Sequence, residues 1–322
     1  MISRTFILIA ACFLICFHAG AGQYTEIVAF GDSTSDVGNS FSIPDKIPYP
    51  SAYPLQAWVK QLATMYKIAT FKASGNGTFA VGSDYAYSGT STKYTSDKGW
   101  TWGDNKFILK RNLTDQISDR YLGPFNKDGA KTGPEALHTV WTGLNDLVLA
   151  YNDKKQIKEK WSGLDQMSVE VARSVEGQIQ ALATAGVKNI LWLNLPDPSK
   201  FPGIVSQKLA GGSGLKALSD SSLAFNKEMD AAIDRLKKAN PGLNLIKLDV
   251  AKRLGEILEN PTAHGFKNVK SGGFTDGDLF FFDGIHLTPH GNHLLAKFAY
   301  DTLQKQDGQE ANRQLSLSKG EK

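Results

Sequence analysis

Residues 27–33 of the chain read IVAFGDS. The run at 27–30 is apolar at every position, which is typical of a short strand buried on both faces of a parallel sheet. Gly31 ends this run, and Ser33 follows at the carboxyl end of the predicted strand, where open parallel sheets place their functional groups. Ser33 is therefore a candidate nucleophile, although this tripeptide alone equally suits the N-cap of a following helix.

Strand and helix patterns alternate along the rest of the chain. Apolar runs predict strands at residues 139–141, 187–195 and 243–250, and helical spacing predicts helices at residues 54–68, 164–185, 215–239 and 289–303. Strands separated by helices favour an α/β fold with a parallel sheet covered on both faces. Residues 71–135 are irregular and rich in Gly, Thr, Ser, Asp and aromatic residues, so we expect them to shape a binding site.

Composition places the chain among ordinary folded proteins. It has 322 residues, 41% of them hydrophobic and 21% charged, which is too apolar for a disordered chain. The formal net charge is +4, and the 36 basic residues are interspersed with 32 acidic ones, so no basic patch for nucleic acid is expected. No repeat or linker divides the chain, and we predict a single domain.

The N-terminus has the pattern of a secretory signal peptide. Arg4 precedes an apolar run at residues 6–17, and the small residues AGA at 19–21 suit a cleavage site. The run is shorter than the ~20 apolar residues of a membrane-spanning helix, so we expect no stable membrane insertion. We therefore predict a signal peptide at 1–21, one domain at 22–307, a loose polar tail at 308–322 and a secreted, extracellular protein.

Secretion would have chemical consequences. Cys12 and Cys16 are the only cysteines and would leave with the signal peptide, which excludes disulfides, a cysteine nucleophile and a thiolate metal site. The triplets NGT at 76–78 and NLT at 112–114 make Asn76 and Asn112 candidate glycosylation sites in a eukaryotic host.

Asp283 and His286, near the other end of the chain, suit a general base and the group that orients it. A histidine acts as base to a serine only when its tautomer and orientation are fixed, usually by a carboxylate. An aspartate three positions earlier, on a tight turn, can reach the second ring nitrogen. Gly89 and Asn145 are candidate oxyanion donors, although each alone is more typical of a turn or a loop cap.

Together and in this order, these segments resemble the four sequence blocks of the GDSL or SGNH hydrolase family. Residues 30–39 (FGDSTSDVGN) are similar to the first block, Gly89 to the second, residues 143–146 (GLND) to the third, and Asp283 with His286 to the last. The resemblance spans residues 27–303. It implies a flavodoxin-like three-layer α/β/α sandwich with a central parallel sheet, the SGNH hydrolase fold.

The resemblance also implies a mechanism. Ser33 would form the acyl-enzyme, His286 would act as base and Asp283 would orient it. Ser33, Gly89 and Asn145 would hold the oxyanion. This implies a secreted carboxylic ester hydrolase, a GDSL esterase/lipase, without a cofactor or a metal.

Several alternatives remain open at this stage. We expect the substrate to be a small-molecule or polysaccharide ester. Its acyl group would be an acetyl or another short chain, as in acetylated carbohydrates. A lipase, phospholipase or acyltransferase acting on lipid esters is one alternative, and a catalytically silent binding protein on the same scaffold is another. The sequence leaves the oligomeric state open.

Two groups of side chains have both a functional and a structural interpretation. His286, His290 and His293 could form a metal site. We prefer a solvated helix face for His290 and His293, because Pro289 in the first turn leaves His286 outside that helix. Aromatic residues in the irregular stretch would stack on sugar rings, line an acyl pocket or pack the long loop, and these are Tyr85, Tyr87, Trp100 and Trp102.

Overall fold

The computed structural model of the protein describes residues 24–40, 56–75, 79–92, 100–102, 105–107, 112–152, 160–206, 212–270, 272 and 278–320. The predicted signal peptide at 1–21 and the candidate glycosylation site Asn76 lie outside the described residues, as do the side chains of Trp100 and Trp102.

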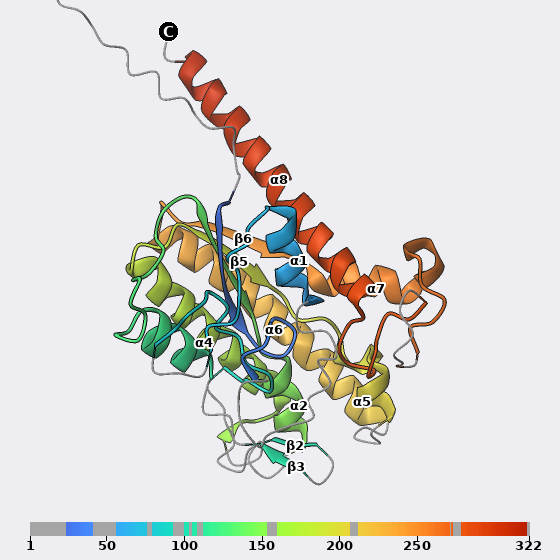
Figure 1. Cartoon of the computed structure of the whole chain (residues 1–322). Coiled ribbons are helices and arrows are strands. Elements are labelled where there is room, and N and C mark those ends of the chain that lie inside the picture. Colours follow the sequence, from blue (N-terminus) through green and yellow to red (C-terminus); the bar gives the residue numbers. More distant parts are fainter. Residues whose placement is uncertain are drawn as a thin grey trace, which may run out of the picture.

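A parallel sheet of four strands forms the centre of the molecule (Figure 1). Its strands, in spatial order, are β1 (Glu26–Gly31), β4 (Ala136–Trp141), β5 (Asn189–Leu193) and β6 (Asn244–Leu248). Every residue of β4 and β5 is buried, because both faces of the sheet are covered. The register pairs Gly31 with Trp141 and Leu193 with Leu248, so the carboxyl ends of neighbouring strands meet at one edge.

Residues 83–85 run parallel to β1 along its free edge. Ala29 N donates to Ser83 O at 2.9 Å, and Tyr85 N donates to Ala29 O at 2.7 Å. The Tyr85 ring stacks on Phe30 with 5.6 Å between ring centroids. This segment leads directly into Gly89, and so brings that glycine to the carboxyl end of β1.

Helices cover the two faces of the sheet (Figure 1). On one side α2 (Leu144–Asn152), α4 (Leu164–Thr184) and α6 (Gly212–Ala239) pack against one another. On the other side α1 (Trp58–Met65) packs against α8 (Pro289–Gly320), and Arg253 of α7 (Val250–Glu259) lies over the Phe298 ring of α8. None of the helices in the described parts of the chain is long and apolar enough to span a membrane.

Shorter elements complete the described part of the chain. They are an antiparallel pair of strands, β2 (Trp100–Trp102) and β3 (Asn105–Phe107), the π-helix Asp115–Tyr121, the 3-10 helices Pro198–Lys200 and Pro261–His264, and α5 (Pro202–Ser206).

The predicted α/β fold with a covered parallel sheet is confirmed. β5 is shorter than the predicted strand at 187–195, because Val187 N instead closes the end of α4 by donating to Leu182 O at 3.1 Å. Helix α7 is not predicted by the patterns above, although Asp249 caps it by accepting a hydrogen bond from Lys252 N at 3.1 Å.

Most of the segment that we expected to be a loose polar tail, residues 308–322, is helical in the structure, and its looseness stays a prediction. Residues 308–320 continue α8 as far as Gly320. Between Gly308 and Gly320 the sequence has no proline or glycine, and most of its residues are good helix formers, so no signal ends the helix earlier.

Candidate active site

Gly31 allows the chain to turn sharply at the end of β1. Its φ is +152°, and a Cβ on this residue would lie 2.2 Å from Trp141 O on the neighbouring strand. The Gln116 side chain bonds both backbone groups of Gly31, because Oε1 accepts from Gly31 N and Nε2 donates to Gly31 O, each at 2.8 Å. These contacts fix the point from which the loop carrying Ser33 begins.

Ser33 lies in a tight turn that Asp32 organises. Ser35 N and Asp36 N both donate to Asp32 O at 3.1 Å. The buried Asp32 carboxylate accepts from Thr34 N at 3.0 Å and from Thr34 Oγ1 at 2.8 Å. The hydrogen bonds between its two neighbours, Asp32 and Thr34, thus hold Ser33 at the carboxyl edge of the sheet.

Asp283 and His286 lie on a second turn, before α8. Asp283 Oδ1 accepts from Ile285 N at 2.9 Å and from His286 N at 2.7 Å, which shapes the turn. Gly284 has a φ of +85°, and a Cβ there would lie 2.6 Å from Gly203 N, so only glycine fits this turn. Asp283 Oδ2 is consequently free to face the imidazole, at 2.6 Å from His286 Nδ1.

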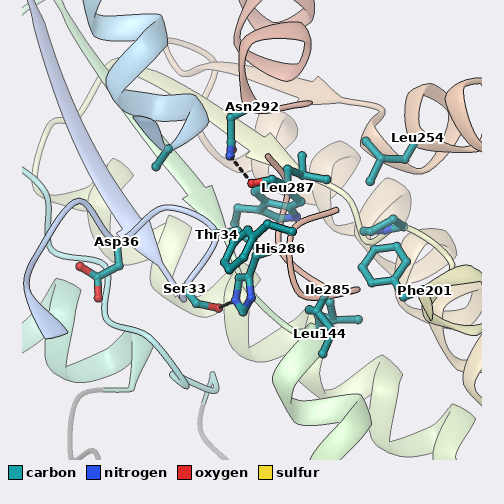
Figure 2. Close-up of a pocket in the computed structure, with 14 residues that line it drawn as sticks. Ser33, Thr34, Asp36, Leu144, Phe201, Leu254, Ile285, His286, Leu287 and Asn292 are labelled. Atoms are coloured by element: carbon teal, nitrogen blue, oxygen red, sulfur yellow. Dashed lines mark hydrogen bonds between the residues drawn. The ribbon is translucent and has the colours of Figure 1, made fainter. Parts of the chain in front are cut away.

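The two turns meet through the imidazole. His286 Nε2 lies 2.8 Å from Ser33 Oγ, and Figure 2 shows the two side chains pointing toward each other. An ionised Asp283 accepts only, so His286 Nδ1 carries the proton and a neutral Nε2 can accept the Ser33 hydroxyl hydrogen. The structure therefore brings together Ser33, His286 and Asp283 in the arrangement that serine activation requires.

Burial and nearby carboxylates together determine the protonation of His286. Burial lowers the pKa of His286, but the charge of Asp283, its hydrogen bond and the charge of Asp32 outweigh this and raise the pKa above its ordinary value. Burial also acts to raise the pKa of Asp283, yet the His286 ring and the backbone donors hold it below its ordinary value. Asp283 is therefore ionised at neutral pH and stabilises the imidazolium form.

The loop that carries Gly89 is bonded to the loop that carries Ser33. Ser88 N and Ser88 Oγ donate to Asp36 Oδ2 at 3.0 and 3.1 Å, and Ser40 Oγ donates to the same oxygen. Gly89 has a φ of +77°, which favours glycine at this turn. The carboxylate of Asp36 thus connects Gly89 with the turn in which Ser33 lies.

Asn145 and Asp146 hold the other end of the same loop. Asn145 Nδ2 donates to Thr90 O at 2.8 Å, and the Asp146 carboxylate accepts from Thr92 N at 3.0 Å and from Thr92 Oγ1 at 2.9 Å. Because an amide nitrogen carries two hydrogens, one N–H of Asn145 is not needed for the Thr90 contact. The structure brings Asn145 and the Gly89 loop together, and their action on an oxyanion stays a prediction.

An apolar pocket opens beside Ser33 and His286 (Figure 2), with about 650 Å³ of space when its open mouth is included. Figure 2 shows Phe201 and Leu254 on the side of Ser33 that faces away from Asp36. The apolar walls come from the starts of α1 and α2, from the end of β4, from the segment after β5, from α7 and from the turn at 282–288 (the histidine turn). They are Ala57, Trp141, Leu144, Pro196, Phe201, Leu254, Phe282, Ile285 and Leu287. Such walls can accept a hydrocarbon group of a substrate and remove it from water.

The other candidate residues have contacts of their own. His290 packs against Phe266 with 4.7 Å between ring centroids, and His293 Nδ1 lies 3.0 Å from Gln61 Oε1. Among the residues that the structure describes, no group of three or more His, Cys, Asp or Glu could hold a metal ion. Tyr85 and Tyr87 are buried, so they pack the interior and are not exposed to a sugar ring.

Asn112, the second candidate glycosylation site, lies at the start of a helical segment. Its Oδ1 accepts from Asp115 N at 3.0 Å, and its backbone N donates to Asp115 Oδ2 at 3.0 Å. This reciprocal pair is a capping box, which uses the oxygen of the amide and not its nitrogen. Glycosylation of Asn112 stays a prediction.

Sequence reasoning missed residues whose side chains bond backbone groups near the site. Gln116 bonds Gly31 across 85 positions, and Asp84 accepts from Val37 N at 2.8 Å and from Ala86 N at 3.0 Å. Burial, with the charge of Asp36, raises the pKa of Asp84 well above its ordinary value. No local pattern distinguishes this glutamine or aspartate from others, because their partners are distant in sequence or are backbone groups.

The chain is similar to known proteins over most of its length. The sequence model of the family described as GDSL-like Lipase/Acylhydrolase matches residues 27–299. An acetylesterase of Thermothelomyces thermophilus is 22% identical over 280 residues, which cover 85% of this chain and 87% of that protein. A GDSL esterase/lipase of Arabidopsis thaliana is 21% identical over 333 residues (90% and 93%), and a phosphatidylcholine-sterol acyltransferase of Aeromonas hydrophila is 25% identical over 258 residues (77% and 65%).

Proposed function

This chain belongs to the GDSL lipase and acylhydrolase family, and from that premise we propose that it hydrolyses carboxylic esters through an acyl-enzyme formed on Ser33. It is an ester-bond hydrolase, as its family and relatives establish. The observation that carries the proposed mechanism is the hydrogen-bond chain from Ser33 Oγ through His286 to Asp283, with distances of 2.8 and 2.6 Å.

Acylation begins at the Ser33 hydroxyl. Its Oγ attacks the ester carbonyl carbon while His286 Nε2 takes the proton, and a tetrahedral intermediate with a negatively charged oxygen forms. Asp283 stabilises the imidazolium. The intermediate then collapses, His286 gives its proton to the leaving alcohol, and the acyl group stays bonded to Ser33.

Deacylation repeats these steps with water. His286 Nε2 takes a proton from a water molecule, whose oxygen attacks the acyl carbon and releases the carboxylic acid as Ser33 regains its proton. In both halves of the reaction the N–H groups of Ser33 and Gly89, with the amide of Asn145, donate to the oxyanion. The contacts of Asp36 with Ser88 and of Asn145 with Thr90 support this assignment, because they hold Gly89 and Asn145 beside the turn in which Ser33 lies.

The proposed substrates are short-chain or acetyl esters, such as those of acetylated carbohydrates. The similarity to a protein named acetylesterase, across 85% of this chain, supports this choice. A lipid ester is the second candidate, and the apolar walls of the pocket favour it because they suit a hydrocarbon group.

We further propose that the protein is secreted and glycosylated. The support is in the sequence: an apolar run at 6–17 after Arg4, the small residues at 19–21, and the acceptor triplets that begin at Asn76 and Asn112. Mass spectrometry of protein from the culture medium of a eukaryotic host tests this, since the mature N-terminus and any glycan are read directly. An N-terminus that begins at Met1 would contradict cleavage.

One set of assays tests the proposed activity and the substrate. The full chain and its Ser33→Ala variant are assayed on p-nitrophenyl esters from acetate to decanoate, on acetylated xylan and on phospholipid. Highest kcat/KM on acetyl esters supports the first candidate, whereas a steep rise with acyl length supports a lipid ester. Absence of turnover on every ester, with no labelling of Ser33 by a fluorophosphonate probe, would identify a silent scaffold.

A further inference from the structure

Trp58, the first residue of α1, contacts the nucleophile turn (residues 32–36) with its side chain. The Trp58 side chain is fully buried, and its indole Nε1 donates to Ser35 Oγ at 3.2 Å. Ser35 is two positions after Ser33, and its backbone N closes the nucleophile turn by donating to Asp32 O. The indole therefore bonds to the turn that positions the serine hydroxyl.

The backbone of Trp58 contacts the opposite end of the chain. Trp58 N donates to Asn292 Oδ1 at 3.0 Å, across 234 positions. The N-cap residue Ala57 has no side chain that can accept a hydrogen bond, so Asn292 supplies the acceptor that the first turn of α1 requires.

Asn292 uses its other amide atom to hold the histidine turn. Its Nδ2 donates to Leu287 O at 2.9 Å and to Thr288 O at 3.2 Å, the two residues that follow His286. Figure 2 shows this contact above the pocket, with the amide of Asn292 directed at the carbonyl of Leu287. One nearly buried amide thus bonds to α1 with its oxygen and to the histidine turn with its nitrogen.

We propose that Trp58 and Asn292 form a polar bridge that sets the position of His286 relative to Ser33, and that Asn292 is a positioning residue for the reaction. The proposal rests on the proposed function, since it assigns a role to residues beyond the hydrogen-bond chain of Ser33, His286 and Asp283. Ser33 and His286 are 253 positions apart and reach each other across one 2.8 Å contact. A displacement of about 1 Å at such a contact costs roughly 10²-fold in rate, so a bridge that fixes both turns affects turnover directly.

The bridge can be broken at one atom at a time. Asn292→Asp keeps the oxygen that accepts from Trp58 N but replaces the Nδ2 donor with an oxygen that faces two carbonyls. Trp58→Phe keeps the backbone N–H and an aromatic ring at this position but removes the indole donor to Ser35, and Ser35→Ala removes the acceptor of that same bond. Gln61→Ala is the matched control, because Gln61 also joins α1 to α8, through Pro289 O at 3.0 Å, without touching either turn.

The measurements are kcat and KM on a p-nitrophenyl ester and the rate of Ser33 labelling by a fluorophosphonate. We expect Asn292→Asp to lower kcat and the labelling rate by about 10- to 100-fold with KM changed less than about twofold, as for a group acting in the transition state. Trp58→Phe and Ser35→Ala should each slow labelling, and the double variant should be no slower than either alone. Gln61→Ala should match the wild type.

The outcomes separate this proposal from the proposed function. If the wild-type chain is not labelled at Ser33, the function is wrong. If it is labelled and folded Asn292→Asp reacts at the wild-type rate, or changes only KM, the bridge is overturned while the function stands. Circular dichroism melting shows which variants are folded, and additive effects of Trp58→Phe and Ser35→Ala would also overturn the bridge.

Discussion

Asn145 Nδ2 donates a hydrogen bond to Thr90 O at 2.8 Å, one residue beyond Gly89. The amide therefore lies beside the loop from which a second oxyanion donor is expected. Asn145→Ala should lower kcat by roughly 10²- to 10³-fold with little change in KM, because the amide binds a charge that exists only in the transition state. Steady-state kinetics on p-nitrophenyl acetate measure both constants.

A control variant distinguishes the loss of an oxyanion donor from a loosening of the loop that carries Gly89. Thr92→Val removes the Oγ1 contact with Asp146 but keeps the backbone N–H that also donates to that carboxylate. It should leave kcat within about fivefold of the wild type, since one side-chain hydrogen bond contributes about 1 kcal/mol net, which corresponds to about a factor of five. A change confined to KM in Asn145→Ala would argue that Asn145 binds substrate and not the oxyanion.

Ser33→Ala should reduce ester turnover by at least about 10³-fold, because it removes the nucleophile while binding and the oxyanion donors remain. The fold should be unaffected, since the neighbouring turn is held by Asp32 and Thr34 and not by the Ser33 hydroxyl. Ester assays and circular dichroism test the two parts. Turnover near the wild-type level would refute the assigned nucleophile.

The pH dependence should report the protonation of His286. Only the neutral imidazole accepts the Ser33 proton, so kcat/KM should rise with pH through the pKa of His286 and then level off. Asp283 and Asp32 raise this pKa against the effect of burial, so the rising limb should lie above the ordinary histidine value of about 6.5.

Asp283→Asn should change both the pH at which kcat/KM rises and the value of kcat. Its Oδ1 can still accept from Ile285 N and His286 N, so the turn should persist. Loss of the negative charge lowers the pKa of His286, which moves the rising limb to lower pH. The new amide donor favours the wrong imidazole tautomer, and kcat should fall by roughly 10²- to 10⁴-fold. A limb that stays in place would show that Asp283 does not control the histidine.

Glycine at position 31 can be tested through stability. Gly31→Ala should lower the free energy of unfolding by about 2–4 kcal/mol, because its Cβ would lie 2.2 Å from Trp141 O and its φ is +152°. Gly177→Ala is the control: Gly177 lies in the interior of α4 with no atom within 4 Å of an added Cβ, so it should stabilise by about 0.5–1 kcal/mol. Urea denaturation measures both, and equal effects would contradict the steric argument.

The sequence predicts the parts of this site that depend on local geometry. Ile27 to Ser33 is one strand and its following turn, and Asp283 and His286 are three positions apart on one turn, so spacing alone indicates which side chains can meet. The parallel sheet follows from the alternation of strands and helices. The meeting of Ser33 with His286 follows only once a topology is assumed, which the family resemblance supplied.

The contacts that support these residues could not be predicted in this way. Trp58 and Asn292 are 234 positions apart, and Gln116 and Gly31 are 85 apart. Tryptophan, asparagine and glutamine occur throughout the chain, and nothing in their sequence neighbours indicates a backbone partner on another element. The pairing of Trp58 with Asn292 depends on tertiary packing, since α1 and α8 are far apart in the sequence but pack against each other on one face of the sheet.

His290 and His293, one turn apart on α8, are the side chains that a metal-dependent mechanism would need. His290 packs on Phe266 and His293 contacts Gln61, so neither ring is directed at Ser33 by the contacts of the described residues. His290→Ala and His293→Ala should therefore keep kcat/KM within about twofold of the wild type, because the half-buried His290 packs on Phe266 and the exposed His293 contacts Gln61. In parallel assays on a short-chain ester, a chelator and iodoacetamide should leave the activity unchanged, and a fluorophosphonate should abolish it, because the nucleophile is a serine hydroxyl. Inhibition by the chelator alone, or a large loss in either histidine variant, would show that hydrolysis depends on a metal ion and that the serine mechanism is wrong.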